Sequence, residues 1–308
     1  MTDQTTKNPR IKPGWLRVIL FGISFILITL LITIPAAMGL FFANLDQLKA
    51  DPVHALTTLL QGSHLWMMVL LEFIVSLLTV WIFRTFIDRK SMASLGLQMS
   101  GFAQESVIGF FVGPALIGLL SILLMAAGRL QWVDITFDPS SLFISLGMVV
   151  LIAFSEELVF RGYVLSNLLE SFSNKWIALL LSALCFAIFH FSGPGLTPLA
   201  FANLFLAGIL LGVNYIYTRN LWFSFFLHLS WNFFLGPLLG SHVSGLNMPT
   251  LLQTEIKGDW LITGGDFGIE GSVINTALSL VTILVLALAF ERKYNPSGLP
   301  APAKGATA

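Results

Sequence analysis

Charged side chains are scarce in this sequence, and their scarcity excludes most classes of soluble protein. Asp, Glu, Lys and Arg make up only 10% of the 308 residues, whereas they make up about 25% of a typical soluble domain. The 16 basic residues balance the 16 acidic residues, so there is no overall basic field of the kind that recruits nucleic acid. Hydrophobic residues make up 56% of the chain. This composition predicts an all-α polytopic membrane protein.

Cysteine and one common metal-binding motif are also scarce or missing. The single cysteine, Cys185, excludes an internal disulfide and is expected to act as a small buried hydrophobe. The HExxH motif of the common zinc proteases does not occur in the chain. The sequence also has no internal repeat, no heptad array and no second, soluble domain.

The long apolar runs predict about eight transmembrane helices, because a helix needs about 20 apolar residues to cross a bilayer. We expect one integral membrane domain over residues 14–291, between a cytoplasmic N-terminal tail (1–13) and a disordered cytoplasmic C-terminal tail (292–308). The eight expected helices cover residues 15–42, 64–83, 105–128, 141–168, 176–191, 199–217, 221–239 and 272–290.

The distribution of basic residues predicts the orientation of these helices. With the N-terminus inside, twelve of the basic residues lie on the inner side, and only Lys49, Arg129 and Lys257 lie on the outer side. Basic residues are enriched on the cytoplasmic side of membrane proteins. Both termini are therefore expected in the cytoplasm, and the long connection 240–271 is expected outside.

The stretch "AFSEELVFRG" places charged residues inside the fourth expected helix. A charge at the bilayer centre costs roughly 2.5 to 3.5 kcal/mol, so such residues need partners, water or a function. Glu157 and Arg161 are four apart, which predicts an ion pair. Glu156 is rotated about 100° from Glu157 and needs another partner or a water-filled cavity. It is a candidate general base, although a purely structural ion-pair cluster explains these residues equally well.

Two more stretches carry polar residues at helical spacing. In "FAIFHFSG", Phe186 and His190 are four apart, and in "FLHLSWNF", His228 and Asn232 are four apart. A lone histidine at position 190 would more often be a hydrogen-bonded packing residue, and His228 with Asn232 alone would be ambiguous. Together with Glu156, they supply a base, two imidazoles and a neutral donor, which is the set expected of a hydrolytic site.

The segments "EELVFRG", "FAIFH" and "HLSWN" resemble, in this order, the three signature motifs of the CPBP family. This family contains the type II CAAX prenyl endopeptidases and their bacterial relatives, including bacteriocin-processing and immunity proteins. The resemblance covers about residues 140–240. It implies an eight-helix intramembrane endopeptidase with a buried active-site cavity. It also implies a bacterial plasma-membrane location and a peptide or membrane-anchored protein as substrate. A prenylated CAAX substrate is not expected, since bacteria generally lack protein prenylation.

The resemblance also implies roles for particular residues. The catalytic residues would be Glu156, His190, His228 and Asn232, and the supporting residues would be Glu157, Arg161 and Phe186. Two mechanisms fit this set equally well. In one, Glu156 activates water directly, without a metal. In the other, Glu156, His190 and His228 bind a zinc ion.

Two other functions compete with hydrolysis. One is a non-catalytic scaffold of the same family that binds a peptide, bacteriocin or partner protein. The other is a transporter, since intramembrane Glu and His also mark ion pathways. The chain shows no inverted halves with interrupted helices, which argues against transport.

Three further features lead to expectations about packing. A helix rises about 1.5 Å per residue, which places His190 roughly 22 Å from the cytoplasmic end of its helix and His228 only about 10 to 14 Å from the end of its own. The two histidines can share one site only if the helix of His228 begins below the interface, begins earlier or tilts. Gly208 and Gly212 predict a close helix contact within the monomer. Glu270, in the outer connection, is expected to be a solvated turn residue.

Overall fold

The computed structural model describes residues 8–50 and 62–295. The two ends of the expected tails, 1–7 and 296–308, lie outside the described residues, as does His54. The C-terminal helix continues to Tyr294, beyond the expected start of the C-terminal tail.

The described chain consists mainly of helices, several of which are extended by π-helical turns. They are α1 (Gly14–Ala43), α2 (Leu45–Ala50), α4 (Gly62–Ile82) with the π-helix η1 (Phe83–Ile87), the 3-10 helix η2 (Met92–Leu95), α5 (Ala103–Ala126), α6 (Pro139–Glu157) with the π-helix η3 (Leu158–Leu165) and α7 (Ser166–Ser171), α8 (Lys175–Phe189), α9 (Pro198–Gly212), α10 (Tyr215–Thr218), α11 (Trp222–Phe233) with the π-helix η4 (Phe234–Leu238), α12 (Trp260–Thr263), the 3-10 helices η5 (Gly265–Phe267) and η6 (Ile269–Gly271), and α13 (Val273–Tyr294).

Helices occupy each of the eight positions expected from the apolar runs. Among the described residues, six helical segments are long and apolar enough to cross a membrane: 14–43, 65–87, 103–126, 139–171, 198–218 and 273–294. α8 is shorter: its 15 residues make a helix of about 22 Å at about 1.5 Å per residue. The predicted class, an all-α polytopic membrane protein, is confirmed, whereas the number of eight spans stays a prediction.

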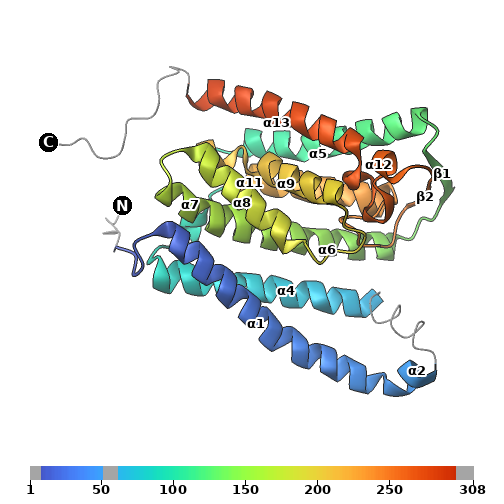
Figure 1. The fold of residues 1–308 in the computed structure, drawn as a ribbon, viewed down its shortest axis with the longest axis horizontal. Helices are drawn as coiled ribbons and strands as arrows, with labels where there is room; N and C mark the ends of the chain where they lie inside the picture. The colour runs from blue at the N-terminus through green and yellow to red at the C-terminus, as the bar shows by residue number, and fades with distance from the viewer. Residues whose placement is uncertain (1–7, 51–61, 296–308) are drawn as a thin grey trace.

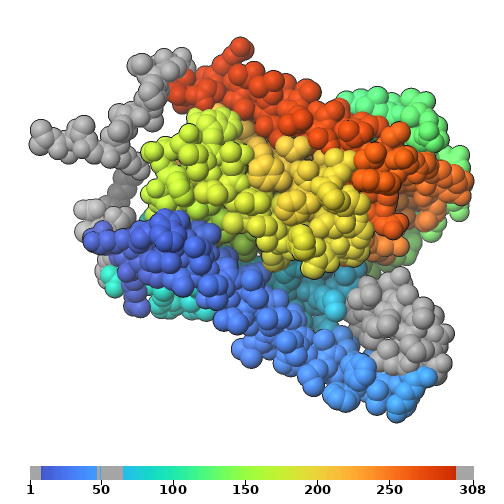
Figure 2. All heavy atoms as spheres, in the orientation of Figure 1, coloured from blue at the N-terminus to red at the C-terminus, as the bar shows by residue number. Residues whose placement is uncertain are grey.

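The long helices lie side by side, with the start of α1 and the end of α13 near one end of the bundle (Figure 1). α1 and α4 form one side, α5 and α13 form the other, and α6, α8, α9 and α11 lie between them. Figure 2 shows α8 and α9 on the near face, between α1 and α13. We call the end where α1 begins and α13 ends the terminal end.

The opposite end carries a short two-stranded sheet that the sequence did not predict. β1 (Leu130–Ile135) pairs antiparallel with β2 (Leu252–Ile256), and the register shifts between Trp132 and Asp134. The pair joins the α5–α6 connection to the 239–272 connection, and Figure 1 shows it far from the start of α1 and the end of α13. We call this end the strand end.

Capping residues in the sequence set where several of the helices begin. Asp138, Asn174 and Thr197 each accept a backbone N–H at the start of α6, α8 and α9, respectively. Proline follows directly at the first helical position of α6 and α9, where its missing N–H costs no helix hydrogen bond. The caps of α6 and α8 fix the starts of the helices that position Glu156 and His190.

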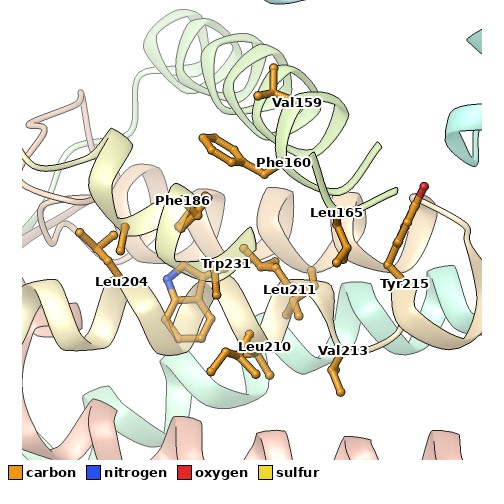
Figure 3. Packing of buried hydrophobic residues seen from close by; sticks show 14 of the residues in the cluster. Val159, Phe160, Leu165, Phe186, Leu204, Leu210, Leu211, Val213, Tyr215 and Trp231 are labelled. Carbon is orange, nitrogen blue, oxygen red and sulfur yellow. The ribbon is translucent and has the colours of Figure 1, made fainter. Parts of the chain in front are cut away.

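The apolar core surrounds η3, in which every residue is buried. Phe160 from η3 and Phe186 from α8 meet edge to face, with ring centroids 5.2 Å apart. Figure 3 shows this pair together with Trp231 from α11. The lone cysteine, Cys185, is half-buried against the same core.

The close helix contact predicted at Gly208 is present within the monomer. A Cβ atom at Gly208 would lie 2.7 Å from the Cα atom of Ala183 in α8. A Cβ atom at Gly212 would lie 2.5 Å from Leu179, also in α8. Glycine therefore allows the backbones of α8 and α9 to approach.

A buried ionic cluster ties the helices together at the terminal end. Asp88 is fully buried and accepts hydrogen bonds from Arg17 at 3.0 Å and from Arg84 at 2.9 Å. Asn167 of α7 lies 3.3 Å from the same carboxylate. Two arginines balance this carboxylate, and Arg17 also pairs with Glu170. The cluster connects α1, η1 and α7.

Candidate active site

A cavity of about 390 Å³ lies among α4, α6, α8, α9 and α11. The 190–197 and 239–272 connections also line it, which places the cavity toward the strand end. Most of its wall is apolar. Its charged or polar lining side chains are those of Glu72, Glu156, His190, Ser192, His228, Asn232, Ser244 and Glu270.

Glu156 lies near the end of α6 and lines this cavity. The residue is only 8% exposed. The closest ionisable partner is His190, whose Nε2 lies 3.7 Å from Glu156 Oε2. Oε2 has no hydrogen-bond partner among the described residues. A buried carboxylate oxygen in this state favours a bound water or ligand, because desolvation without a hydrogen bond is costly.

His190 is the C-cap residue of α8. Its Nδ1 lies 2.9 Å from the carbonyl oxygen of Phe186, one of the carbonyls that a helix end leaves without a partner. A carbonyl can only accept, so Nδ1 carries the proton and Nε2 is directed toward Glu156. The ring of Phe186 packs against the imidazole, with centroids 4.6 Å apart.

Glu157, Arg161 and His228 form a second, fully buried group beside Glu156. Arg161 Nη1 and His228 Nδ1 both donate to Glu157 Oε1, at 2.9 Å and 2.8 Å. Arg161 Nη2 also donates to the carbonyl oxygen of Gly208 at 3.0 Å, and the guanidinium lies over the ring of Phe186. These contacts use Nδ1 of His228, so its Nε2 has no partner among the described residues. His228 also lines the cavity.

The pairing of Glu157 with Arg161 occurs where α6 changes into the π-helix η3. Such wide turns are rare and often occur at functional sites. The structure thus contains the ion pair that the spacing of four predicts.

Asn232 lies one turn after His228 on α11. Both side chains are buried and line the cavity, as a shared inward face predicts. The structure therefore brings Glu156, His190, His228 and Asn232 to one cavity, but their catalytic roles stay predictions.

The difference in depth between the two histidines is explained by the turn before α11. Asn220 and Leu221 in this turn are buried beneath the segment around η2. Leu221 donates its backbone N–H to Gly96 O at 3.0 Å, and Trp222 Nε1 donates to Leu97 O at 3.1 Å. α11 therefore begins below the end of the bundle, so counting residues from its start underestimated the depth of His228.

Glu270 is a cavity residue that the sequence did not reveal. It accepts a hydrogen bond from Trp231 Nε1 at 2.6 Å and another from the backbone N–H of Ser244 at 2.7 Å. Burial raises the pKa of the Glu270 carboxyl, although these hydrogen bonds act in the opposite direction. The expected solvated turn residue is thus a half-buried link between the 239–272 connection and α11. The sequence around Glu270 is rich in glycine and resembles an ordinary surface turn, so the contacts of Glu270 with Trp231 and Ser244 could not be predicted from it.

Glu72 of α4 is the second cavity residue that sequence reasoning missed. The sequence contains a feature that could have revealed Glu72: it is a lone carboxylate in a long apolar run, with no basic residue within one helical turn.

The zinc set expected from the sequence does not fit this geometry well. Among residues 8–50 and 62–295, no three His, Cys, Asp or Glu side chains are grouped so that they could hold a metal ion. A zinc site at Glu156, His190 and His228 stays an untested prediction.

Comparison with known protein families gives a match over part of the chain. Residues 138–234 match the sequence model of a family described as "Type II CAAX prenyl endopeptidase Rce1-like". These residues are therefore similar to an Rce1-like domain. The domain contains Glu156, His190, His228 and Asn232, and the match confirms the resemblance to the CPBP family. No curated protein and no solved structure matches the chain.

The Rce1-like domain supports an intramembrane endopeptidase of the CAAX type in general. Together with the six apolar helices, it supports a multi-pass membrane protein that acts on a peptide or protein substrate within the lipid bilayer. Glu72 and the whole 239–272 connection lie outside the matched segment. Part of the cavity wall is therefore contributed by segments beyond the domain.

Proposed function

We propose that this protein is a glutamate-dependent intramembrane endopeptidase, with Glu156 as the general base. The observation that carries the proposal is the buried Oε2 of Glu156, which lines a cavity shared with two imidazoles and an amide and has no hydrogen-bond partner among the described residues. Glu157 Oε2 also lacks a partner, but Glu157 Oε1 accepts hydrogen bonds from Arg161 and His228, whereas the described residues supply no hydrogen bond to Glu156.

Nε2 of His190 lies 3.7 Å from Glu156 Oε2, which is too long for a direct hydrogen bond. The mechanism begins with a water molecule that is bound between these two atoms. Glu156 takes one proton as the water oxygen bonds to the carbonyl carbon of the peptide. His228 Nε2–H and the Asn232 amide stabilise the resulting oxyanion. When the C–N bond breaks, protonated Glu156 gives its proton to the leaving amine and becomes a carboxylate again.

Glu157 and Arg161 act through His228. The hydrogen bond from Nδ1 to Glu157 favours the doubly protonated imidazole, in which Nε2 is a donor. Arg161 holds Glu157 in place from the other side. These two residues are therefore positioning residues in the proposal.

The test is cleavage of a peptide library by purified protein in lipid nanodiscs, with products identified by mass spectrometry. Glu156→Gln preserves shape but removes the base, so it should abolish cleavage without changing folding. Glu255→Gln is the matched control, because it makes the same chemical change on the exposed strand β2. Near-normal cleavage by the Glu156→Gln protein would refute the mechanism. Loss of cleavage with an intact biological role would favour the scaffold function instead.

A chelator separates the metal-free mechanism from the zinc mechanism. We expect cleavage to survive prolonged dialysis against 1,10-phenanthroline, because no step of the proposed mechanism uses a metal. Loss of activity that added zinc restores would overturn this part of the proposal and assign Glu156, His190 and His228 to a metal site.

We also propose that the protein lies in a bacterial plasma membrane with both termini in the cytoplasm. Basic residues support this orientation, since Arg17, Arg84 and Lys90 meet Asp88 and Glu170 at the terminal end. In this orientation the cavity lies in the outer half of the membrane, below the 190–197 and 239–272 connections.

A further inference from the structure

Glu72 stands apart from the other carboxylates around the cavity. Glu157 is held by Arg161 and His228, and Glu270 is held by Trp231 and Ser244. Within the described chain, Glu72 has neither a hydrogen bond nor an ion pair, and its only charged neighbour of note is another acid, Glu156.

The position of Glu72 on α4 directs it to the same space as the reacting groups. Leu65, Met68, Val69 and Glu72 follow the spacing of one helical face, and all four line the cavity. α4 therefore contributes an apolar wall that ends in a single carboxylate. Glu156 faces the same cavity from α6, 8% exposed and with one oxygen lacking a hydrogen bond.

An uncompensated carboxylate in a largely apolar cavity favours a ligand that brings a positive charge. The imidazoles of His190 and His228 do not meet this need, because each is engaged near Glu156 or Glu157. A peptide can supply the missing cation as a Lys or Arg side chain or as a free α-ammonium group. The adjacent apolar wall suits hydrophobic neighbours in the same peptide.

We propose that Glu72 is a specificity-determining residue that binds a cationic group of the peptide substrate and places it beside the scissile bond. The proposal rests on the peptidase function proposed above, and it adds the class of substrate: apolar peptides with a positive charge near the cleavage site. Glu72 takes no part in the transfer of protons or in bond cleavage.

The test compares sets of apolar peptides that differ only in one residue, Lys, norleucine or Glu, placed in turn at each position around the cleaved bond. The parent protein should cleave the Lys peptides best. In Glu72→Gln the ratio of kcat/KM for Lys over norleucine peptides should fall by about 10- to 100-fold, mainly through KM, as for loss of one charge-assisted hydrogen bond. Glu72→Asp should keep part of the preference, Glu72→Lys should favour the Glu peptides, and the control Glu255→Gln should keep the parent ratio.

Two results overturn the proposal: a parent protein with no preference for Lys over norleucine, or a Glu72→Gln protein that keeps the preference. An equal loss for all peptides also overturns it, because a structural defect would act on every substrate.

The affinities of the same peptides can also be compared between the Glu156→Gln protein and the Glu72→Gln/Glu156→Gln double variant. This measurement does not depend on cleavage. Absence of cleavage by the parent protein would therefore refute the proposed peptidase, whereas the preference for a cation is judged separately from the binding ratios.

Discussion

Replacing Arg161 is the strongest test of how the charged groups are held inside the membrane domain. Its side chain is 1% exposed, donates to Glu157 and to the Gly208 carbonyl, and covers the ring of Phe186. Arg161→Met keeps most of the apolar stem but leaves Glu157 with His228 alone. Loss of one partner from a buried ion pair costs about 3 to 5 kcal/mol, so we expect the free energy of unfolding to fall by about this amount.

Unfolding by increasing amounts of SDS in mixed micelles, followed by the fluorescence of the eight tryptophans, measures this difference. Arg129→Ala is the control, because Arg129 is exposed and a surface substitution changes stability by only about 0.5 kcal/mol. The double variant Glu157→Gln/Arg161→Met removes both charges and should lose less stability than Arg161→Met alone. A change below about 1 kcal/mol in Arg161→Met would show that the pair is not effectively buried.

Three further predictions follow from the same structure. Asn232→Ala should lower kcat by about 10²- to 10³-fold with little change in KM, as for loss of one oxyanion donor, and an equal rate would remove Asn232 from the mechanism. Gly208→Ala should destabilise the protein by about 1 to 3 kcal/mol in the same unfolding assay, because the new Cβ would lie 2.7 Å from the backbone of α8. Gly118→Ala, with no atom within 4 Å of the new Cβ, should not destabilise, and equal losses would argue against the tight α8–α9 contact. Reporter fusions at Lys293 and Lys257 should read inside and outside, respectively; the opposite result at Lys257 would reject the orientation.

Much of the fold and part of the site could be predicted from local patterns in the sequence. Apolar runs are long enough to show where helices form, because each helix satisfies its own backbone hydrogen bonds in lipid. Spacing of four residues paired Glu157 with Arg161 and Phe186 with His190, because these pairs lie within one helix, where the geometry is independent of the rest of the chain.

Contacts between distant segments could not be predicted in this way. The approach of His228 to Glu157 depends on α11 packing beside α6. The depth of α11 depends on Gly96 and its neighbours, which lie more than a hundred residues earlier. The antiparallel pairing of β1 with β2 likewise joins two connections that no local pattern relates.

The sequence by itself determined the membrane class, the positions of the helices and the membership of the polar set, since composition and helical periodicity are properties of single segments. Only the tertiary structure decided which carboxylates share the cavity. Glu270, in the glycine-rich 239–272 connection, accepts a hydrogen bond from Trp231, and Glu72 of α4 lines the same cavity. The physical reason is that burial and partnership depend on which surfaces pack together, and that packing is a property of the whole chain.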